Sequence, residues 1–250
     1  MMIPVFEGVI ARRVLLNYRA DPAVIRRMVP AALEVVTHNE AAVVGVCLIR
    51  LERLRVKGSP ALFAMASENM AQRVAVRYRT ANGWREGVFI WRRETDRRVI
   101  ALFGGRLFPG VHQAADFRVV DTGRLIVFDV RTAGGTADVS LVAERVIEWE
   151  PKGLFGSLGE ASEFFRRGDC GLSCALDGRS LEGMQLRTLR WEVEPLRVVE
   201  SRAVFYEQFP PGSIELDSAL LMRGLPHEWH ALPEVPDLGS PQEIHIEVGR

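Results

Sequence analysis

Short runs of apolar residues dominate the chain, and most of them have the length of β-strands. Apolar and polar residues alternate in many of these runs, which is typical of strands buried on one face. The run 41–54 is instead almost continuously rich in Val, Leu and Ile, which predicts a strand buried on both faces. We expect roughly ten strands, over residues 9–18, 33–37, 41–54, 69–80, 84–94, 114–120, 125–131, 137–148, 172–176, 184–193 and 198–209.

Turn residues join several of these strands into hairpins. Asn82-Gly83 stands between two strand-like runs and is the strongest short-range hairpin signal, because both turn positions need a positive φ. The segment 121–123, Asp-Thr-Gly, joins the next two runs in the same way. The sheet is therefore expected to be antiparallel.

Helices are few and short. Asp21-Pro22 predicts a helix start within 21–30, since Asp can cap exposed backbone N–H groups and Pro fits the first helical position. Ser157 and Glu160 have capping-box spacing and predict a helix that ends at residue 168. Further helices are expected over residues 96–103, 216–223 and 227–230, the last packing Trp229 on the sheet.

These elements predict a mainly β (α+β) protein, a large and highly curved antiparallel sheet or β-barrel with a few peripheral helices. Residues 1–232 are expected to form a single domain, because no internal repeat or linker-like segment divides them. Residues 233–250 are rich in Pro and acidic residues and are expected to form a C-terminal tail.

Charge narrows the range of partners. Formal net charge is +0, with 32 basic and 32 acidic residues, so the basic excess of a nucleic-acid binder is missing. The chain shows no signal-peptide pattern and no apolar run long enough for a transmembrane helix. We therefore expect a cytoplasmic protein that binds neither nucleic acid nor membrane.

The cysteines and motifs give no sign of a cofactor. Cys47 lies in an apolar run, where a free cysteine is usually a small hydrophobe. Cys170 and Cys174 are a lone pair, whereas a structural zinc site needs four ligands. Neither a phosphate-binding loop nor a dinucleotide fingerprint is found. We expect no metal and no cofactor.

Several blocks along the chain resemble the acetoacetate decarboxylase-like superfamily. In the N-terminal half they are residues 18–22 (Tyr-Arg-Ala-Asp-Pro), 29–34 (Val-Pro-Ala-Ala-Leu-Glu), 87–91 (Gly-Val-Phe-Ile-Trp) and 104–106 (Gly-Gly-Arg), and in the C-terminal half 162–168, 181–184, 191–195 and 221–229. Their order is similar to that of an uncharacterised branch, the YqjF-like family. The resemblance implies a cone-like β-barrel wrapped by helices, with an interior pocket.

The same resemblance implies a reaction that this chain is not equipped to perform. In acetoacetate decarboxylases a lysine just after the active-site turn forms a Schiff base with a keto acid. Here the matching turn is 104–113, and Gln113 and Ala114 stand at the adjacent lysine positions. The chain's two lysines, Lys57 and Lys152, lie in other loops, so decarboxylation would require one of them to reach the pocket.

Four residues are candidates for ligand binding. Arg106 in the turn could bind a carboxylate through two parallel hydrogen bonds, unless it is a surface arginine. His112 could bind a ligand oxygen or act as a general base, unless it is structural. Gln113 is adjacent, and Glu68 opens a strand that could line the pocket. Arg92 and Arg93 interleave with acidic residues and are expected on a solvated face.

Two functions fit these residues. The first is binding of a small organic or keto acid in the barrel pocket without Schiff-base chemistry. The second is an enzyme acting on keto acids by lysine-independent acid–base catalysis, with His112 as the candidate catalytic residue. Exposed sheet edges would also allow a homo-oligomer.

Overall fold

One continuous sheet contains the described strands of this computed structural model, which describes residues 4–103, 110–132, 137–151, 153–176 and 178–232. The sheet has 13 strands. They are β1 (Phe6–Ala20), β2 (Glu34–Val35), β3 (Thr37–His38), β4 (Ala41–Val56), β5 (Met65–Thr80), β6 (Gly83–Thr95), β7 (His112–Asp121), β8 (Leu125–Thr132), β9 (Ala137–Arg145), β10 (Cys170–Cys174), β11 (Leu181–Thr188), β12 (Glu194–Ala203) and β13 (Ile214–Ala231). The helices are α1 (Pro22–Arg26), α2 (Arg98–Phe103), α3 (Leu158–Arg167), α4 (Val204–Glu207) and a 3₁₀ turn, Ala61–Phe63.

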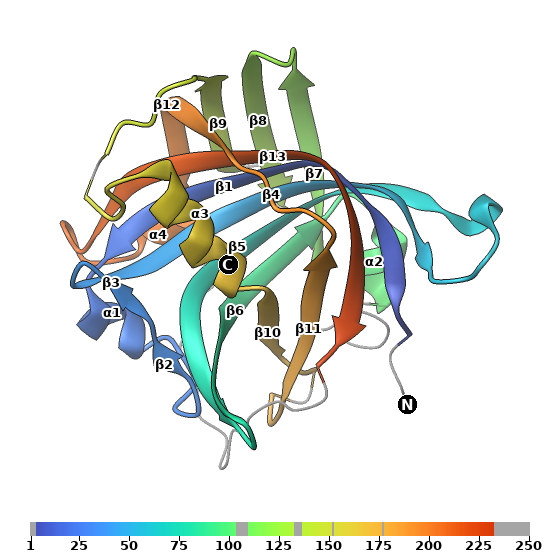
Figure 1. The fold of residues 1–250 in the computed structure, drawn as a ribbon, viewed down its shortest axis with the longest axis horizontal. Helices are drawn as coiled ribbons and strands as arrows, with labels where there is room; N and C mark the ends of the chain where they lie inside the picture. The colour runs from blue at the N-terminus through green and yellow to red at the C-terminus, as the bar shows by residue number, and fades with distance from the viewer. Residues whose placement is uncertain (1–3, 104–109, 133–136, 152, 177, 233–250) are drawn as a thin grey trace.

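The sheet closes on itself twice. A smaller cycle of paired strands runs β1–β4–β5–β6–β10–β11–β13 and returns to β1. A larger cycle uses the same β1, β4, β5, β6 and β13 but continues through β7, β8, β9 and β12. Figure 1 shows β8, β9 and β12 on one side of the shared strands and β10 and β11 on the other. The five shared strands therefore form a wall between two barrel-like compartments.

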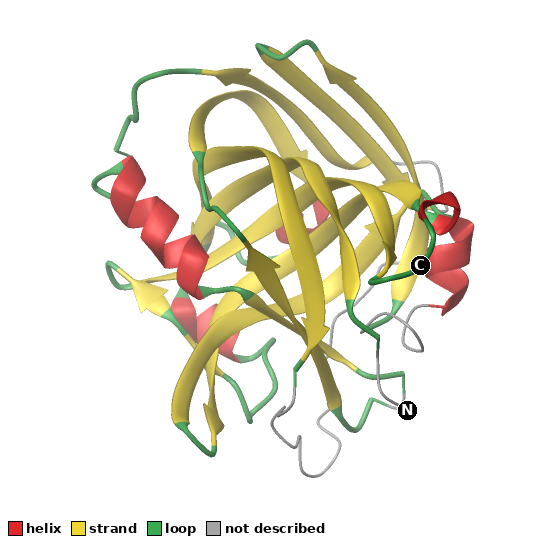
Figure 2. Cartoon of the chain, turned by 45° about the vertical axis from the view of Figure 1, so that its right-hand side comes forward, coloured by secondary structure: helices red, strands yellow, loops and turns green. Residues whose placement is uncertain are grey.

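The pairing is antiparallel throughout this path except on β6. Both β7 and β10 pair with β6 in parallel. The expected mainly β architecture, a curved sheet with a few helices, is confirmed, and Figure 2 shows how far strands outnumber helices. None of the helices in the described ranges is long and apolar enough to cross a membrane.

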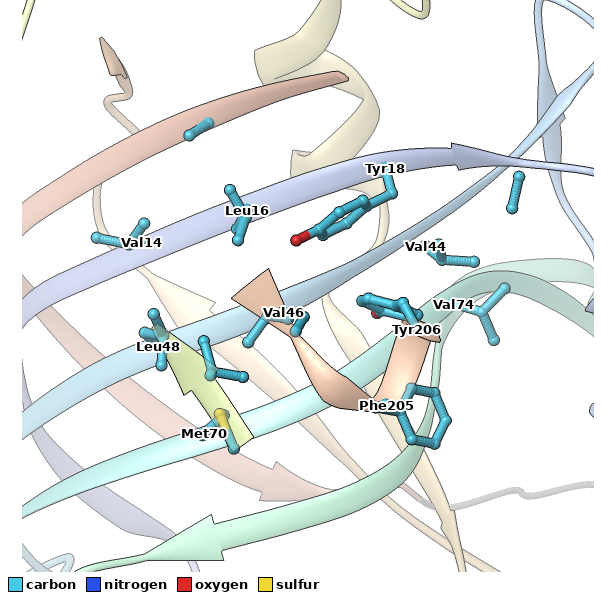
Figure 3. Close-up of a cluster of buried hydrophobic side chains, with 14 of the residues drawn as sticks. Val14, Leu16, Tyr18, Val44, Val46, Leu48, Met70, Val74, Phe205 and Tyr206 are labelled. Carbon is cyan, nitrogen blue, oxygen red and sulfur yellow. The ribbon is translucent and has the colours of Figure 1, made fainter. Parts of the chain in front are cut away.

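Each face of the wall packs against a different set of side chains. Val14, Leu16 and Tyr18 of β1 point into the larger compartment and pack with residues of β4, β5, β8 and β9 (Figure 3). The intervening Leu15 belongs to a second cluster that includes Phe164 and Phe165 of α3. Because successive strand residues point to opposite faces, a wall strand must be apolar on both. This explains why Ala42 to Leu48 are all buried, as the sequence predicted for this strand.

Local sequence signals are confirmed where they depend on near neighbours. Ser157 accepts a hydrogen bond from the Glu160 N–H at 3.1 Å and caps α3, which ends at Arg167. The expected hairpin joins β5 to β6, but Thr80 pairs with Gly83, so the two loop residues are Ala81 and Asn82. Of Asn82 and Gly83 only Gly83 has a positive φ, 109°. The expected short helix before residue 104 is α2.

The C-terminal helices predicted from the sequence are wrong. Residues 216–223 and 227–230 all lie in the strand β13, which pairs with β1 from Ile214 to Trp229. Residues 198–209 are not one strand, since β12 ends at Ala203 and α4 follows. Tertiary pairing along the whole of β1 outweighs the local helical pattern. The predicted tail, 233–250, lies outside the described residues.

A methyl group at Gly45 is expected to destabilise the wall. A Cβ there would lie 2.5 Å from the backbone oxygen of Leu16 and 3.4 Å from Nη2 of Arg73. Gly45→Ala should lower the free energy of unfolding by about 1–3 kcal/mol, the usual cost of overpacking. Denaturant unfolding measures this change.

Gly159→Ala is the matched control, because Gly159 is exposed in α3 and the nearest atom to a Cβ there is 3.9 Å away. It should leave stability equal to or up to about 1 kcal/mol above wild type. Equal unfolding midpoints for the two variants would contradict the close approach of β1 and β4 at Gly45.

Candidate functional site

A cavity of about 150 Å³ lies within the smaller cycle of strands. An apolar cavity of that size is large enough to bind benzene. Its walls are mostly apolar and include Ile49, Leu51, Met184, Leu186, Trp191 and Trp229. Its polar lining includes Arg13, Cys47, Asn69, Arg73, Arg93, Glu94, His112, Asp169 and Cys170. Polar groups that converge on an apolar cavity are the usual arrangement of a small-molecule site.

Three arginines from three of the wall strands line this cavity. Arg13 lies on β1, Arg73 on β5 and Arg93 on β6. We call these three residues the arginine cluster. Small residues on the neighbouring strands leave room for them, since Arg93 pairs with Ala71 and Arg73 with Gly45. The register of the wall therefore brings three guanidinium groups to one compartment.

Arg73 is the most buried of the cluster, with 2% of its surface exposed. Its Nη2 donates to Oδ1 of Asn17 at 2.8 Å, and its guanidinium lies 4.9 Å from the ring centre of Phe165. Its buried Nε has no hydrogen-bond partner among the described residues. Burial lowers the pKa of Arg73 to about 10, which leaves it charged at neutral pH.

The other two arginines contact neutral groups. Arg13 Nε donates to Sγ of Cys47 at 3.3 Å, and Arg93 Nε donates to Oγ of Ser173 at 3.1 Å. Burial lowers the pKa of Arg93 to about 10. In the part of the chain that the structure describes, no carboxylate forms an ion pair with the arginine cluster. Glu94 and Asp169 also line the cavity, and the charge of Glu182 acts on Arg93, so the three guanidiniums lack a direct carboxylate partner rather than all nearby negative charge.

His112 lies beside the arginine cluster. It begins β7 and pairs in parallel with Arg93. Its Nδ1 is 3.1 Å from the carbonyl oxygen of Gly110, which can only accept, so Nδ1 carries the proton of the neutral ring. Burial and the charge of Arg93 lower the pKa of His112 to about 3. The ring is therefore neutral near pH 7, and Nε2 carries its lone pair.

Two of the other predicted site residues, Gln113 and Glu68, do not line this cavity. Gln113 is exposed and accepts a hydrogen bond from Nη2 of Arg92 at 3.3 Å. Glu68 is buried in a separate hollow, where Nη2 of Arg12 donates to both of its carboxylate oxygens at 2.8 and 2.9 Å. Arg106 lies outside the described residues.

No described lysine lines the cavity. Lys57 is half-exposed, and its Nζ lies 2.6 Å from Oε1 of Glu228. Lys152 is outside the described residues. Within those same limits, no group of three or more His, Cys, Asp or Glu is placed to hold a metal ion.

A family model described as an uncharacterized conserved protein, DUF2071, matches residues 10–168. The chain belongs to this family. No functionally curated protein matches the chain.

Several solved structures have a fold similar to that of this family member. The acetoacetate decarboxylase of Legionella pneumophila is 13% identical, with a TM-score of 0.61, and the match covers 92% of this chain and 87% of that one. An acetoacetate decarboxylase-like enzyme from Sphingomonas wittichii RW1 is 12% identical, with a TM-score of 0.58 and coverage of 94% and 95%. The enduracididine biosynthesis enzyme MppR complexed with pyruvate is 12% identical, with a TM-score of 0.58 and coverage of 92% and 89%. At these identities the similarity establishes an acetoacetate decarboxylase-like fold.

The sequence did not single out the arginine cluster of this family member. It placed Arg92 and Arg93 together on a solvated face. In the structure Arg92 does lie 3.0 Å from Glu94, but Arg93 points to the opposite face of β6 and lines the cavity. Arg73 could have been singled out from its position, because it lies within a buried strand. A charged side chain is seldom buried unless it is paired.

Glu94 should make stability depend on pH. Its side chain is 0% exposed, and burial raises its pKa to about 7, partly offset by Arg92. A carboxyl whose pKa is higher in the folded than in the unfolded state stabilises folding at low pH, and this contribution is lost as pH rises through about 7. Relative to Glu94→Gln, wild type should lose roughly 1.4 kcal/mol of unfolding free energy per pH unit between about pH 5 and 7.

Denaturant unfolding across that pH range measures the difference. Glu163→Gln is the control, because Glu163 is exposed and its hydrogen bond with Arg166 lowers its pKa. Any pH dependence that Glu163 contributes is therefore expected at a lower pH than that of Glu94. A constant difference between wild type and Glu94→Gln from acid to neutral pH would show that Glu94 does not titrate in this range.

Proposed function

We propose that this protein binds a small organic acid, such as a keto acid, in the cavity of the smaller cycle without forming a Schiff base. The observation that supports this most directly is the arginine cluster, whose three guanidiniums have no carboxylate partner within the described residues. Buried charge is costly unless it is paired. A carboxylate ligand would supply the missing negative charge through paired N–H···O bonds, as arginine forks commonly do.

The rest of the lining sets the size and character of the ligand. Ile49, Met184 and Trp191 offer apolar surface to the body of the molecule. A volume of about 150 Å³ excludes nucleotides and other large cofactors but accepts an acid of a few carbon atoms. The fold is consistent with such a ligand, because the similar enzyme MppR is described in complex with pyruvate.

Absence of lysine from the described lining supports binding without Schiff-base chemistry. The sequence blocks and the family match further support our placing the chain in the YqjF-like branch of the acetoacetate decarboxylase-like superfamily.

Removal of one guanidinium should weaken ligand binding. Pyruvate and acetoacetate are expected to raise the melting temperature of the wild-type protein, and Arg73→Gln should weaken binding by about tenfold or more, the usual cost of a lost charged hydrogen bond. Calorimetric titration gives the dissociation constants.

Arg77→Gln is the matched control on the same strand, because Arg77 is exposed and pairs with Glu34 outside the cavity. No stabilisation of wild type by either acid, or equal weakening in both variants, would contradict the proposal. Borohydride reduction in the presence of acetoacetate tests the second part of it, since an adduct on Lys57 or Lys152 would show Schiff-base chemistry.

The alternative is an enzyme that acts on keto acids by acid–base catalysis. The observation in its favour is His112, a neutral ring at the cavity whose Nε2 can accept a proton. A base at this position would remove a proton from the carbon next to a ligand carbonyl while the arginine cluster holds the carboxylate.

His112→Gln should then abolish turnover but retain binding. Turnover of a panel of keto acids is measured by proton exchange with deuterated water, and the variant should fall by at least about a hundredfold, as is typical for a general base. Turnover that is equal in wild type and His112→Gln would remove His112 from the mechanism.

A further inference from the structure

The cavity contains a thiol that the proposed binding function does not use. Cys47 lies in the middle of β4, with 7% of its surface exposed, and it lines the cavity. It pairs with Ala71 of β5 on one side and Leu15 of β1 on the other, so no large polar side chain covers it in the plane of the sheet. Cys47 is a free cysteine.

Cationic side chains lie beside this thiol. Arg13 Nε donates to Sγ of Cys47 at 3.3 Å. Burial lowers the pKa of Arg73 and of Arg93, and the charge of Cys47 acts in the opposite direction on both, so all three guanidiniums lie within electrostatic reach of the sulfur. Opposite charges attract, so these cations would draw a small anion toward the sulfur.

A second, independent feature indicates that a ligand belongs beside the sulfur. Only 2% of the surface of Arg73 is exposed, and its Nε has no hydrogen-bond partner among the residues that the structure describes. A buried N–H without an acceptor is costly, and an anion in the cavity would supply one. The thiol of Cys47 and Arg73 line the same cavity, so an anion bound there would lie in the compartment that holds the thiol.

The other two cysteines differ from Cys47 in their partners. Cys170 also lines the cavity, but it donates to Oδ1 of Asp169 at 3.0 Å, and burial raises its pKa to about 12, partly offset by Arg85. Cys174 does not line the cavity, and burial raises its pKa. Among the described residues, no arginine of the cluster donates a hydrogen bond to either sulfur. The chain thus contains internal reference thiols for any measurement on Cys47.

We propose that Cys47 is a nucleophile selective for small carboxylates that carry an electrophilic carbon, in particular the carbonyl carbon of a keto acid. This rests on the proposed function, since the arginine cluster must hold the carboxylate. The sulfur forms a bond to the ketone carbon, the π electron pair of the carbonyl moves to its oxygen, and that oxygen takes up the proton lost by the thiol. No atom leaves and no redox partner is needed, so the adduct, a hemithioketal, forms reversibly.

Two alkylating reagents of similar size and different charge test the inference. Iodoacetate and iodoacetamide react alike: the sulfur–carbon bond forms, the carbon–iodine bond breaks with loss of iodide, and the thiol proton passes to the buffer. Native protein is treated near neutral pH, and the rate at each cysteine is followed by peptide mass spectrometry. Cys47 should prefer iodoacetate by roughly tenfold, because attraction between opposite charges in a partly buried site supports a ratio of that size. Cys170 and Cys174 should show no such preference.

Arginine variants locate the cause of the preference. Arg13→Gln should lower the iodoacetate rate at Cys47 by about tenfold and change the iodoacetamide rate much less, while Arg13→Lys, which keeps the charge, should restore part of it. The inference is overturned if Cys47 shows the same ratio as it does in the denatured protein, or if it is labelled only after denaturation.

Ligand binding to Cys47→Ala separates this inference from the proposed function. Covalent addition needs a carbonyl group, so wild type should bind pyruvate more tightly than lactate, and Cys47→Ala should bind both equally. Equal binding of both acids by wild type would overturn the role of the thiol while leaving the anion site in place. If neither acid binds to wild type, the proposed function fails as well.

Discussion

The wall formed by β1, β4, β5, β6 and β13 is the constraint on which the rest of the structure depends. Because it separates two compartments, the central part of the wall is buried on both faces, as Ala42 to Leu48 of β4 show. A polar side chain on the wall must therefore find a partner inside the protein, whichever way it points. In most proteins of one sheet, alternation would let such residues face solvent. In this protein, alternation instead places the polar side chains of the wall in one or the other of the two compartments.

Charged residues on the two faces of the wall have different partners. On the face of the larger compartment, Arg12 is neutralised by Glu68 through two hydrogen bonds. One residue later in the same strand, Arg13 faces the smaller compartment, where its one side-chain hydrogen bond to a described residue is to the sulfur of Cys47. Arg12 and Glu68 form a complete internal ion pair, which stabilises the fold. Arg13 has no such carboxylate partner in the described part of the chain, which leaves its guanidinium able to bind an anionic ligand.

The sequence predicted those features that neighbouring residues decide. Capping of α3 by Ser157, the turn at Gly83 and the two-sided burial of β4 follow from residues a few positions apart, and the structure has each of them. The candidate site depends instead on register between strands, which places Arg93 opposite Ala71 and Ala71 opposite Cys47. A shift of one residue would turn each side chain to the other compartment. This is why His112 could be predicted from a family-like turn, whereas Arg13 and Arg73 could not.

The strand β13 pairs with β1, β11 and β12, and so takes part in both cycles. Its pairing with β1 joins Phe6 to Trp229, the two ends of the described chain. Closing a chain over so many residues costs conformational entropy, which this pairing must offset. Both cycles are complete only with β13 in place, so the strand that closes the sheet also encloses the arginine cluster. Closure of the fold and burial of charge in the cavity are thus coupled through one strand.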